Sequence, residues 1–199
     1  MICSGVGTTT QAPGGRGGAS VIYTFDNTPN DYYGVYNAVP VNGPTYVSPG
    51  YNGRGYAIQV LSVSAQGLSV PTFMNFYQRS LTVEAWIYPL AVYVGAPYVD
   101  MIIYAQTNAS TYNQYMWMML RNGSNYGAFW GNDAWGPTMF KVNQWQHMAF
   151  TYNYATLTQT VYINGVAGTD VKKFEVVVVR PYTSLLISRA DLTFVISLL

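Results

Sequence analysis

The segment Leu81-Thr-Val-Glu-Ala-Trp-Ile-Tyr-Pro89 alternates between aliphatic residues and polar or aromatic residues. This period of two is typical of a β-strand, and Pro89 ends the run because proline cannot donate to a sheet ladder. One face of the predicted strand is aliphatic and fits between two sheets. The other face carries aromatic and polar groups and one carboxylate. A strand with two such faces is expected near the middle of a sheet.

Further short strands are predicted on both sides of this segment. Asn-Gly pairs at 42–43, 122–123 and 164–165 mark tight turns, and residues 131–137 are expected to form a loop. No amphipathic pattern of helical length is present, and only residues 72–79 could form a short helical turn. About a dozen short strands separated by turns predict an all-β fold, an antiparallel β-sandwich or barrel. Pairing of the first strands with the last would make it a jelly roll.

The composition excludes several functional classes. The chain has 199 residues, which suits one all-β domain, and 9% of them are charged, against roughly 25% in ordinary soluble domains. The net charge of +1 leaves no electrostatic footprint for nucleic acid or an anionic membrane. No apolar run approaches the ~20 residues of a membrane span. Such a profile is usual in secreted, sugar-facing or fibrous proteins.

The domain organisation is predicted from a change in composition. Residues 1–19 are rich in Thr, Gly and Pro and are expected to be a flexible leader, and residues 20–199 are expected to form the folded domain. Cys3 is the single cysteine, so no internal disulfide can form. The first residues lack the pattern of a signal peptide. Either the start is incomplete, or a signal was removed, or the protein is not secreted.

Four segments resemble motifs of a known family. They are Tyr23-Thr-Phe-Asp26, residues 81–89, Trp145-Gln-His-Met-Ala-Phe-Thr-Tyr152 and Val161-Tyr-Ile-Asn-Gly165. The order and spacing of these four segments resemble those of the concanavalin A-like lectin/glucanase superfamily and, within it, of the laminin G-like jelly-roll domains. The resemblance implies a concanavalin A-like jelly roll. One departure is that the family's usual last strand is missing or replaced: residues 193–199 substitute for it, or another chain does, or the gene model is faulty there.

Catalysis is the first functional question that the resemblance raises. Glycoside hydrolysis needs two carboxyl groups about 5 to 9.5 Å apart, and the catalytic members carry an E-x-D-x-x-E pattern. The chain has eight acids, none of them two or four positions from another: Asp26, Asp31, Glu84, Asp100, Asp133, Asp170, Glu175 and Asp191. No catalytic residue is therefore expected, and the chain is predicted not to be an enzyme. A cross-strand pair of acids remains open.

Aromatic residues beside amides are the candidate sugar-binding groups. Trp130 and Trp135 bracket Asn132 and Asp133 on a segment flanked by glycines. Flat rings stack on the apolar faces of sugars, and Asn and Asp hydrogen-bond hydroxyls. Trp86, Tyr88 and Trp117 could extend this platform, or could fill the core of the sandwich because they lie in predicted strands.

The remaining polar candidates have structural alternatives. Glu84 is expected to be a core carboxylate paired with His147 or Trp145, or else an acceptor in a ligand groove. His147, the only histidine, cannot build a zinc site alone.

Two further hypotheses concern single loops. Calcium is a possible cofactor, because the resemblance implies it for many relatives and because Asp26 and Asp31 bring oxygen ligands to one loop. Asx-rich loops also satisfy their own turns. Asn108 and Asn122 begin N-glycosylation sequons, a weak sign of secretion.

These observations predict a non-catalytic, extracellular or secreted recognition module with lectin-like or cell-adhesion character, which binds carbohydrate or an extracellular protein. Two other classes stay open. One is a structural or fibre-forming subunit that assembles through exposed sheet edges, as a homo-oligomer or a fibre. The other is a degenerate glycoside hydrolase.

Overall fold

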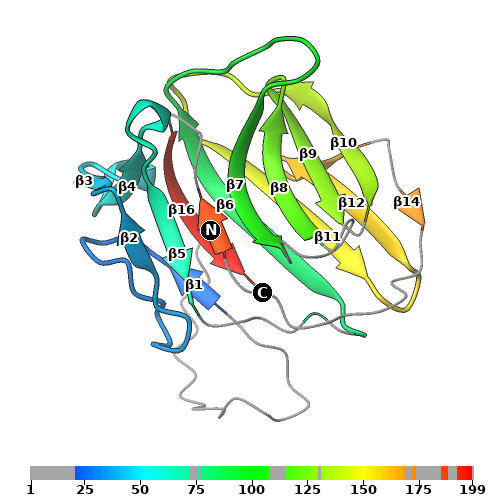
Figure 1. Ribbon diagram of the computed structural model, residues 1–199, viewed down its shortest axis with the longest axis horizontal. Coiled ribbons are helices and arrows are strands. Elements are labelled where there is room, and N and C mark those ends of the chain that lie inside the picture. The colour runs from blue at the N-terminus through cyan, green and yellow to red at the C-terminus, as the bar shows by residue number, and fades with distance from the viewer. Residues whose placement is uncertain are drawn as a thin grey trace.

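Two stacked antiparallel sheets form the protein. The computed structural model describes residues 21–71, 76, 78–107, 115–129, 131–168, 172–173, 185–187 and 192–198. The fold is an all-β antiparallel sandwich, a jelly roll of the concanavalin A type, as predicted. In Figure 1 the sheet that contains β7, β8 and β9 lies in front of the sheet that contains β6, β11 and β12.

The nine-stranded sheet has β6 and β16 near its centre. Its main path runs, in spatial order, through β13 (Val166–Ala167), β12 (Thr158–Ile163), β11 (Gln146–Asn153), β6 (Leu81–Pro89), β16 (Leu192–Leu198), β4 (Ala57–Val60) and β3 (Thr45–Val47). Off this path, β1 (Val21–Tyr23) pairs with β16, and β14 (Lys172–Lys173) pairs with β12. The predicted central strand is therefore central, with β11 on one side and β16 on the other.

The seven-stranded sheet covers the other side of the core. Its order is β10 (Asn132–Met139), β9 (Ser124–Phe129), β8 (Tyr115–Arg121), β7 (Asp100–Thr107), β15 (Leu185–Ile187), β5 (Gly67–Val70) and β2 (Val39–Val41). Two 3-10 turns, η1 (Tyr51–Gly53) and η2 (Ser62–Ser64), lie in connections. They are the helical elements of the described residues, and neither has the length or hydropathy to span a bilayer.

The core lies between the two sheets, where the alternation of β6 buries one face. Leu81, Val83, Ala85 and Ile87 are buried, while the residues between them remain partly exposed. They pack against a continuous cluster that includes Met116, Met118 and Leu120 of β8. Apolar burial of this kind is the main favourable term in folding.

The last described strand, β16, lies near the middle of the nine-stranded sheet. β16 pairs with β6 on one side and with β4 and β1 on the other. The expected contact between first and last strands is therefore present. β16 also joins the β4–β3 pair to the rest of the sheet, so the position beside β6 is occupied by a strand of the same chain.

One sequence-based expectation about a connection was wrong. Residues 131–137 were expected to form a loop, but Asn132–Met139 is the edge strand β10. Its register against β9 shifts between Trp135 and Met139. The Asn42-Gly43 pair has positive φ at both residues, as a tight turn requires, and it leads from β2 in one sheet to β3 in the other. The helical turn expected at 72–79 and the leader at 1–19 lie largely or wholly outside the described residues.

Candidate functional site

The outer face of β6 presents a row of polar and aromatic side chains. Glu84, Trp86 and Tyr88 alternate with the buried aliphatic residues and are each partly exposed. On the neighbouring strand β11, His147 is the register partner of Trp86. Trp145, also partly exposed, comes directly before β11. Two adjacent strands thus place rings and charges on one side of the nine-stranded sheet.

Four rings contact one another on this face. Tyr51 of η1 stacks on Trp86, with ring centroids 4.0 Å apart and planes inclined by 24°. Trp145 approaches Tyr51 edge-on at 5.7 Å and Tyr88 at 5.6 Å. We call Tyr51, Trp86, Tyr88 and Trp145 the aromatic cluster. All four are partly exposed, so the cluster forms a surface.

Gly50 allows the turn that carries Tyr51 to approach the chain ahead of β4. Its N–H donates to the carbonyl oxygens of Arg54 and Gly55. A Cβ atom at this position would lie 2.5 Å from the carbonyl oxygen of Tyr56, which is far inside van der Waals contact. A residue with a side chain would therefore displace the backbone that positions Tyr51 over Trp86.

Glu84 and His147 form a polar pair beside the aromatic cluster. Oε2 of Glu84 lies 3.4 Å from Nε2 of His147, and the imidazole ring lies 5.1 Å from the ring of Trp86. The pairing expected from the sequence is present. The expected core location is wrong, because the side chains are 30% and 21% exposed, respectively. Both can therefore reach a ligand from the solvent side of the sheet.

A polar hollow continues the face toward the start of β6. It is lined by Ser80, Leu81, Thr82, Thr151, Tyr152 and Asn153. Thr82 and Thr151 are register partners on β6 and β11. Within the described residues, neither hydroxyl has a hydrogen-bond partner. The aromatic cluster, the Glu84–His147 pair and this polar hollow together make up what we call the β6 face.

Asp133 and Trp135 lie on the outer face of the opposite sheet. By register, Trp135 is opposite Tyr126 and Asp133 is opposite Ala128. Asn132 is opposite Phe129, a core residue, and so takes the inward position of β10. Trp130 lies outside the described residues. The structure therefore separates the predicted pair Trp86 and Tyr88 from the predicted pair Asp133 and Trp135.

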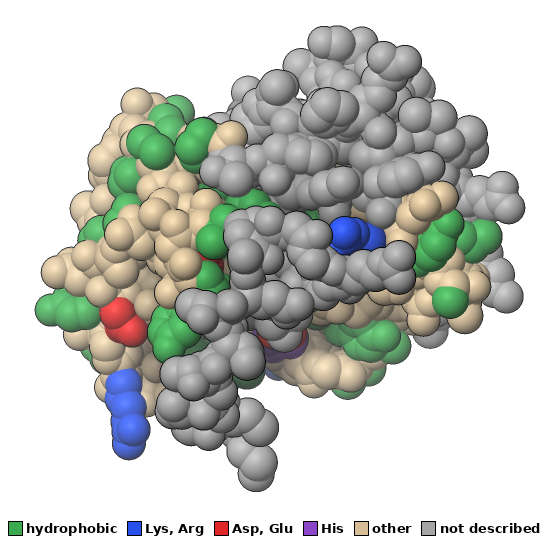
Figure 2. Space-filling view, turned by 90° about the horizontal axis from the view of Figure 1, so that it is seen from below, with side chains coloured by type: hydrophobic (Ala, Val, Ile, Leu, Met, Phe, Trp, Pro, Cys, Tyr) green, Lys and Arg blue, Asp and Glu red, His purple; other side chains and the backbone are tan. Residues whose placement is uncertain are grey.

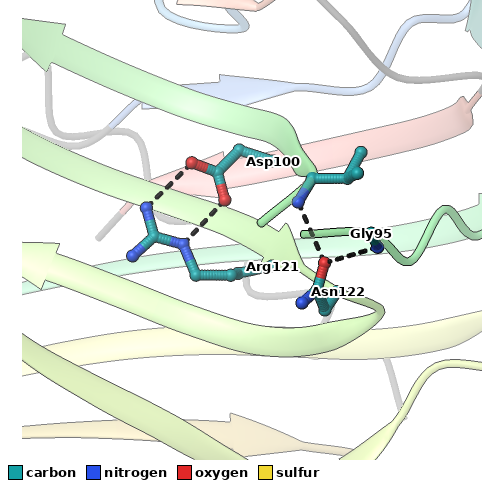
Figure 3. A network of polar contacts seen from close by, with 5 residues as sticks. Gly95, Asp100, Arg121 and Asn122 are labelled. Atoms are coloured by element: carbon teal, nitrogen blue, oxygen red, sulfur yellow. Dashed lines mark hydrogen bonds and ion pairs between the residues drawn. The ribbon is translucent and has the colours of Figure 1, made fainter. Parts of the chain in front are cut away.

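Arg121 is the centre of the cluster around Trp135. Its Nε and one terminal nitrogen donate to the two carboxylate oxygens of Asp100, at 2.7 and 2.8 Å (Figure 3). The guanidinium carbon lies 3.9 Å from the ring centroid of Tyr126 and 5.0 Å from that of Tyr98. The hydrogen bond to Asp100 raises the pKa of Arg121, so the cation is held by a bidentate partner and two rings.

Tyr126 shows that this second cluster is partly interior. The side chain is 1% exposed and packs with Met119 and Ala128, which are also buried. Burial, together with a hydrogen bond to Asp133, raises the pKa of Tyr126 above its ordinary value. Trp117 packs against the same group, and its buried Nε1 has no partner within the described residues. Tyr126, Trp117 and Trp135 therefore belong to a packed cluster, whereas the four partly exposed rings of the aromatic cluster belong to neither hydrophobic core cluster of the described residues.

A family comparison identifies the chain. The model described as the concanavalin A-like lectin/glucanases superfamily matches residues 62–190, which is more than half of the sequence. The chain belongs to this superfamily. A search of curated protein sequences gave no match.

Solved structures of other proteins have the same fold. Domain 4 of AbnA, a GH43 extracellular arabinanase from Geobacillus stearothermophilus, in complex with arabinotriose, is 17% identical, with a TM-score of 0.59; the match covers 90% of this chain and 92% of that one. The binding domain of Paraclostridial Mosquitocidal Protein 1 is 16% identical (TM-score 0.65), with coverage of 89% and 47%. The receptor-binding domain of botulinum neurotoxin mosaic serotype C/D is 14% identical (TM-score 0.63), with coverage of 91% and 46%. The chain thus spans about half of each of the two toxin structures, and its likeness to all three structures is a likeness of fold.

Asp26 and Asp31, the two acids considered as calcium ligands, accept hydrogen bonds from backbone N–H groups. Oδ1 of Asp31 accepts the N–H of Ile22, and Oδ2 accepts those of Val35 and Tyr36. Oδ1 of Asp26 accepts the N–H of Tyr56. N–H groups that point at both oxygens of Asp31 place positive dipoles where a cation would bind, so the arrangement does not fit calcium. Among the described residues, no three His, Cys, Asp or Glu side chains gather as metal ligands.

The sequon residue Asn122 has a structural contact. Its Oδ1 accepts the N–H groups of Gly95 and Val99, at 3.2 and 2.9 Å, and so anchors the loop ahead of β7 (Figure 3). Its positive φ of 46° fits the tight β8–β9 turn that the Asn-Gly pair predicted. Asn108 lies outside the described residues. Glycosylation at both positions stays a prediction.

Sequence reasoning missed Tyr51, and it missed the contacts that Trp145 makes with Tyr51 and Tyr88. Tyr51 reaches Trp86 from a turn in a distant connection, and no local pattern indicates that contact. Trp145 and His147 did carry a signal, because residues two apart in a strand share a face. That signal becomes a site once β11 is known to lie beside β6.

Proposed function

We propose that the chain is a non-catalytic, extracellular recognition module that binds carbohydrate through the β6 face. The observation that carries this proposal is the aromatic cluster beside the Glu84–His147 pair. Sugars offer apolar C–H faces for stacking and hydroxyls for hydrogen bonds. Open aromatic rings next to a carboxylate and an imidazole meet both requirements.

The positions of the acids support a non-catalytic role. Among the described acids, Glu84 is on the outer face of one sheet, and Asp100 and Asp133 are on the outer face of the other. β7 and β10 are three strand spacings apart, or about 14 Å. The backbones of these two strands are thus farther apart than the catalytic carboxyl groups of glycosidases, which are about 5 to 9.5 Å apart, and Arg121 lies on β8 between them. Asp100 is also bound to Arg121, so among the acids that the structure describes none is placed as a catalytic partner of Asp133.

The sheet edges argue against assembly into fibres. Edge strands that pair with other chains are long, flat and regular. β2, β3 and β13 have two or three residues each, and β2 contains Pro40. β10 is longer, but its register is shifted between Trp135 and Met139, which disrupts a regular ladder. A recognition role therefore fits the described edges better than a structural one.

The surrounding surface and the related structures also support recognition of a neutral, hydroxyl-rich ligand. On the face of the molecule that Figure 2 shows, the charged side chains of the described residues appear at only a few separate places. One matched structure is described as a domain of an extracellular arabinanase in complex with arabinotriose. The toxin domains are described as binding and receptor-binding domains, so a protein or receptor glycan is the second kind of partner to test.

A glycan array followed by titration calorimetry tests the proposal. The wild-type protein should bind a defined set of glycans, and Trp86→Ala should abolish that binding. The matched control is Tyr32→Ala, because Tyr32 is 73% exposed and belongs to the connection after β1. The control should bind as the wild type does. Absence of binding to every glycan at millimolar concentration, or binding that survives Trp86→Ala, would refute the proposal, as would hydrolysis of a bound glycan.

A further inference from the structure

We infer that the ligand of the β6 face is an extended, uncharged oligosaccharide whose chain runs along β6, from the aromatic cluster to the polar hollow. This inference rests on the proposed function and adds the shape, the direction and the charge class of the ligand. Three observations carry it: the length of the β6 face, the order of its chemical groups, and its charge.

The length of the β6 face exceeds that of a single sugar ring. Its outward residues are Thr82, Glu84, Trp86 and Tyr88. Outward positions repeat every two residues, or about 6.8 Å, so the row from Thr82 to Tyr88 covers about 20 Å. β11 runs beside this row in continuous register from Gln146 to Tyr152. A compact monosaccharide would contact only part of such a row.

The chemical groups change in order along β6. The aromatic cluster lies at the Tyr88 end and offers stacking surfaces. The Glu84–His147 pair comes next and offers an acceptor and a nitrogen donor or acceptor. The hydroxyls of Thr82 and Thr151 follow in the polar hollow. Each of these groups suits a different sugar unit, so affinity should grow as the ligand reaches from the rings to the hydroxyls.

The charge of the β6 face selects against acidic sugars. Glu84 is the one carboxylate at the outward positions of β6 and β11, and no Lys or Arg occupies those positions. His147 already lies against Glu84. A uronate or a sulfate seated beside Glu84 would therefore meet a like charge, which is costly at a partly desolvated site. Arg79 is exposed just before Ser80, so acidic ligands need their own arm in the test.

Titration calorimetry with ligands of increasing length tests the inference. The neutral probes are arabino-, xylo- and cello-oligosaccharide series, and the acidic probe is an oligogalacturonate series of matched lengths. For the neutral series that binds, affinity should rise with length and then level off. Oligogalacturonates should bind more weakly at every length. Glu84→Lys should reduce or reverse the difference in affinity between neutral oligosaccharides and oligogalacturonates. Glu84→Gln should reduce this difference without reversing it.

The polar hollow has its own variant. Thr82→Val/Thr151→Val keeps β-branched side chains in both strands and removes the two hydroxyls. This variant should bind the shortest ligand as the wild type does, and lose roughly two- to tenfold in affinity for the longest one. Equal losses at all lengths, or no loss at any length, would overturn the inference.

The outcomes separate this inference from the proposed function. If no glycan binds, or if Trp86→Ala leaves binding intact, the proposed function itself fails. If Trp86→Ala abolishes binding but affinity is independent of length, the site is a single-sugar site and only the inference fails. The same holds if oligogalacturonates bind more tightly than the neutral series. Circular dichroism and a thermal melt of each variant identify those that have not folded.

Discussion

Tyr51 and Trp86 stack at a ring-centroid distance of 4.0 Å, although one belongs to a 3-10 turn and the other to the central strand of a sheet. The stack places an irregular connection over the outer face of the nine-stranded sheet. Trp86 also contacts His147, so Tyr51 belongs to a layer of rings that extends across β6 and β11. The conformation of this connection therefore affects the shape of the candidate site.

Removing the Tyr51 ring should uncover Trp86. Aromatic pairs of this geometry contribute about 0.5–1.5 kcal/mol beyond the area that they bury. Tyr51→Ala should therefore lower the free energy of unfolding by roughly that amount and make tryptophan fluorescence easier to quench with acrylamide. Tyr51→Phe keeps the ring and is the control. The same Tyr51→Ala change in a Trp86→Phe background assigns the change in quenching to Trp86. If Tyr51→Ala increased quenching equally in the two backgrounds, the result would contradict the stack.

Asn125 should contribute strongly to stability because it bridges the two sheets. The side chain is fully buried in β9, and its Nδ2 donates to the carbonyl oxygens of Tyr162 and Ala149, at 2.7 and 3.4 Å. Asn125→Leu should cost about 1–3 kcal/mol, because it removes hydrogen bonds inside the core. Asn125→Asp should cost more, because a carboxylate would face two carbonyl oxygens.

Urea unfolding measures the effect of the Asn125 variants. Ser124→Ala is the neighbouring control, since Ser124 is partly exposed, and it should change stability by no more than about 0.5 kcal/mol. An Asn125→Leu variant as stable as the wild type would show that the bridge does not stabilise the fold.

Gly127 should tolerate no side chain, because the opposite sheet lies against it. A Cβ atom there would lie 2.4 Å from Cδ2 of Phe150 and 3.0 Å from Cγ1 of Val161. Gly127→Ala should therefore destabilise the fold by about 1–3 kcal/mol through overpacking. Combining it with Phe150→Leu should give a loss smaller than the sum of the two single losses. Strict additivity in urea unfolding would mean that the two positions do not compete for space.

Two buried tyrosines should make the protein less stable at alkaline pH. Burial is the main cause that raises the pKa values of Tyr23 and Tyr104 well above the ordinary value of 10.0. Above about pH 10 the unfolded chain releases these protons while the folded chain keeps them. The contribution of these two tyrosines to stability should therefore be constant below that pH and fall above it, by about 1.4 kcal/mol per pH unit for each tyrosine.

Urea unfolding between neutral pH and about pH 11 checks this alkaline dependence. Tyr104→Phe should lower stability at neutral pH but weaken the decline above pH 10. A stability that stays flat to the end of this range, or a decline that Tyr104→Phe leaves unchanged, would show that these tyrosines are not held in their neutral form.

The central strand could be predicted to the residue, whereas β10 could not. Alternation is a local property, and residues 81–89 carry it without interruption. Residues 131–137 carry Gly131, Gly136 and Pro137, which are turn formers in most settings. An edge strand with a register shift tolerates them, because a missing N–H costs little where no further strand pairs. The outcome depended on the sheet position, which the local sequence does not contain.

The candidate site could be predicted only in part for the same reason. Trp86 and Tyr88 share a face by alternation, and so do Asp133 and Trp135. Placing both pairs on one platform required knowing which sheet each strand joins, and the structure puts them on opposite sides of the sandwich. The contact of Tyr51 with Trp86 is set by the tertiary fold, since η1 and β6 are not adjacent in the chain.

The placement of β16 has a consequence for synthesis of the protein. Trp86 and Val195 are register partners although more than a hundred positions separate them, and β16 alone links β6 to β4 in the described sheet order. During translation, β4 and β6 leave the ribosome well before the strand that must fit between them. The gap beside β6 therefore stays open until residues 192–198 emerge, and its late closure over a long loop should make folding slow. Nascent chains would need shielding of this unpaired backbone from their neighbours.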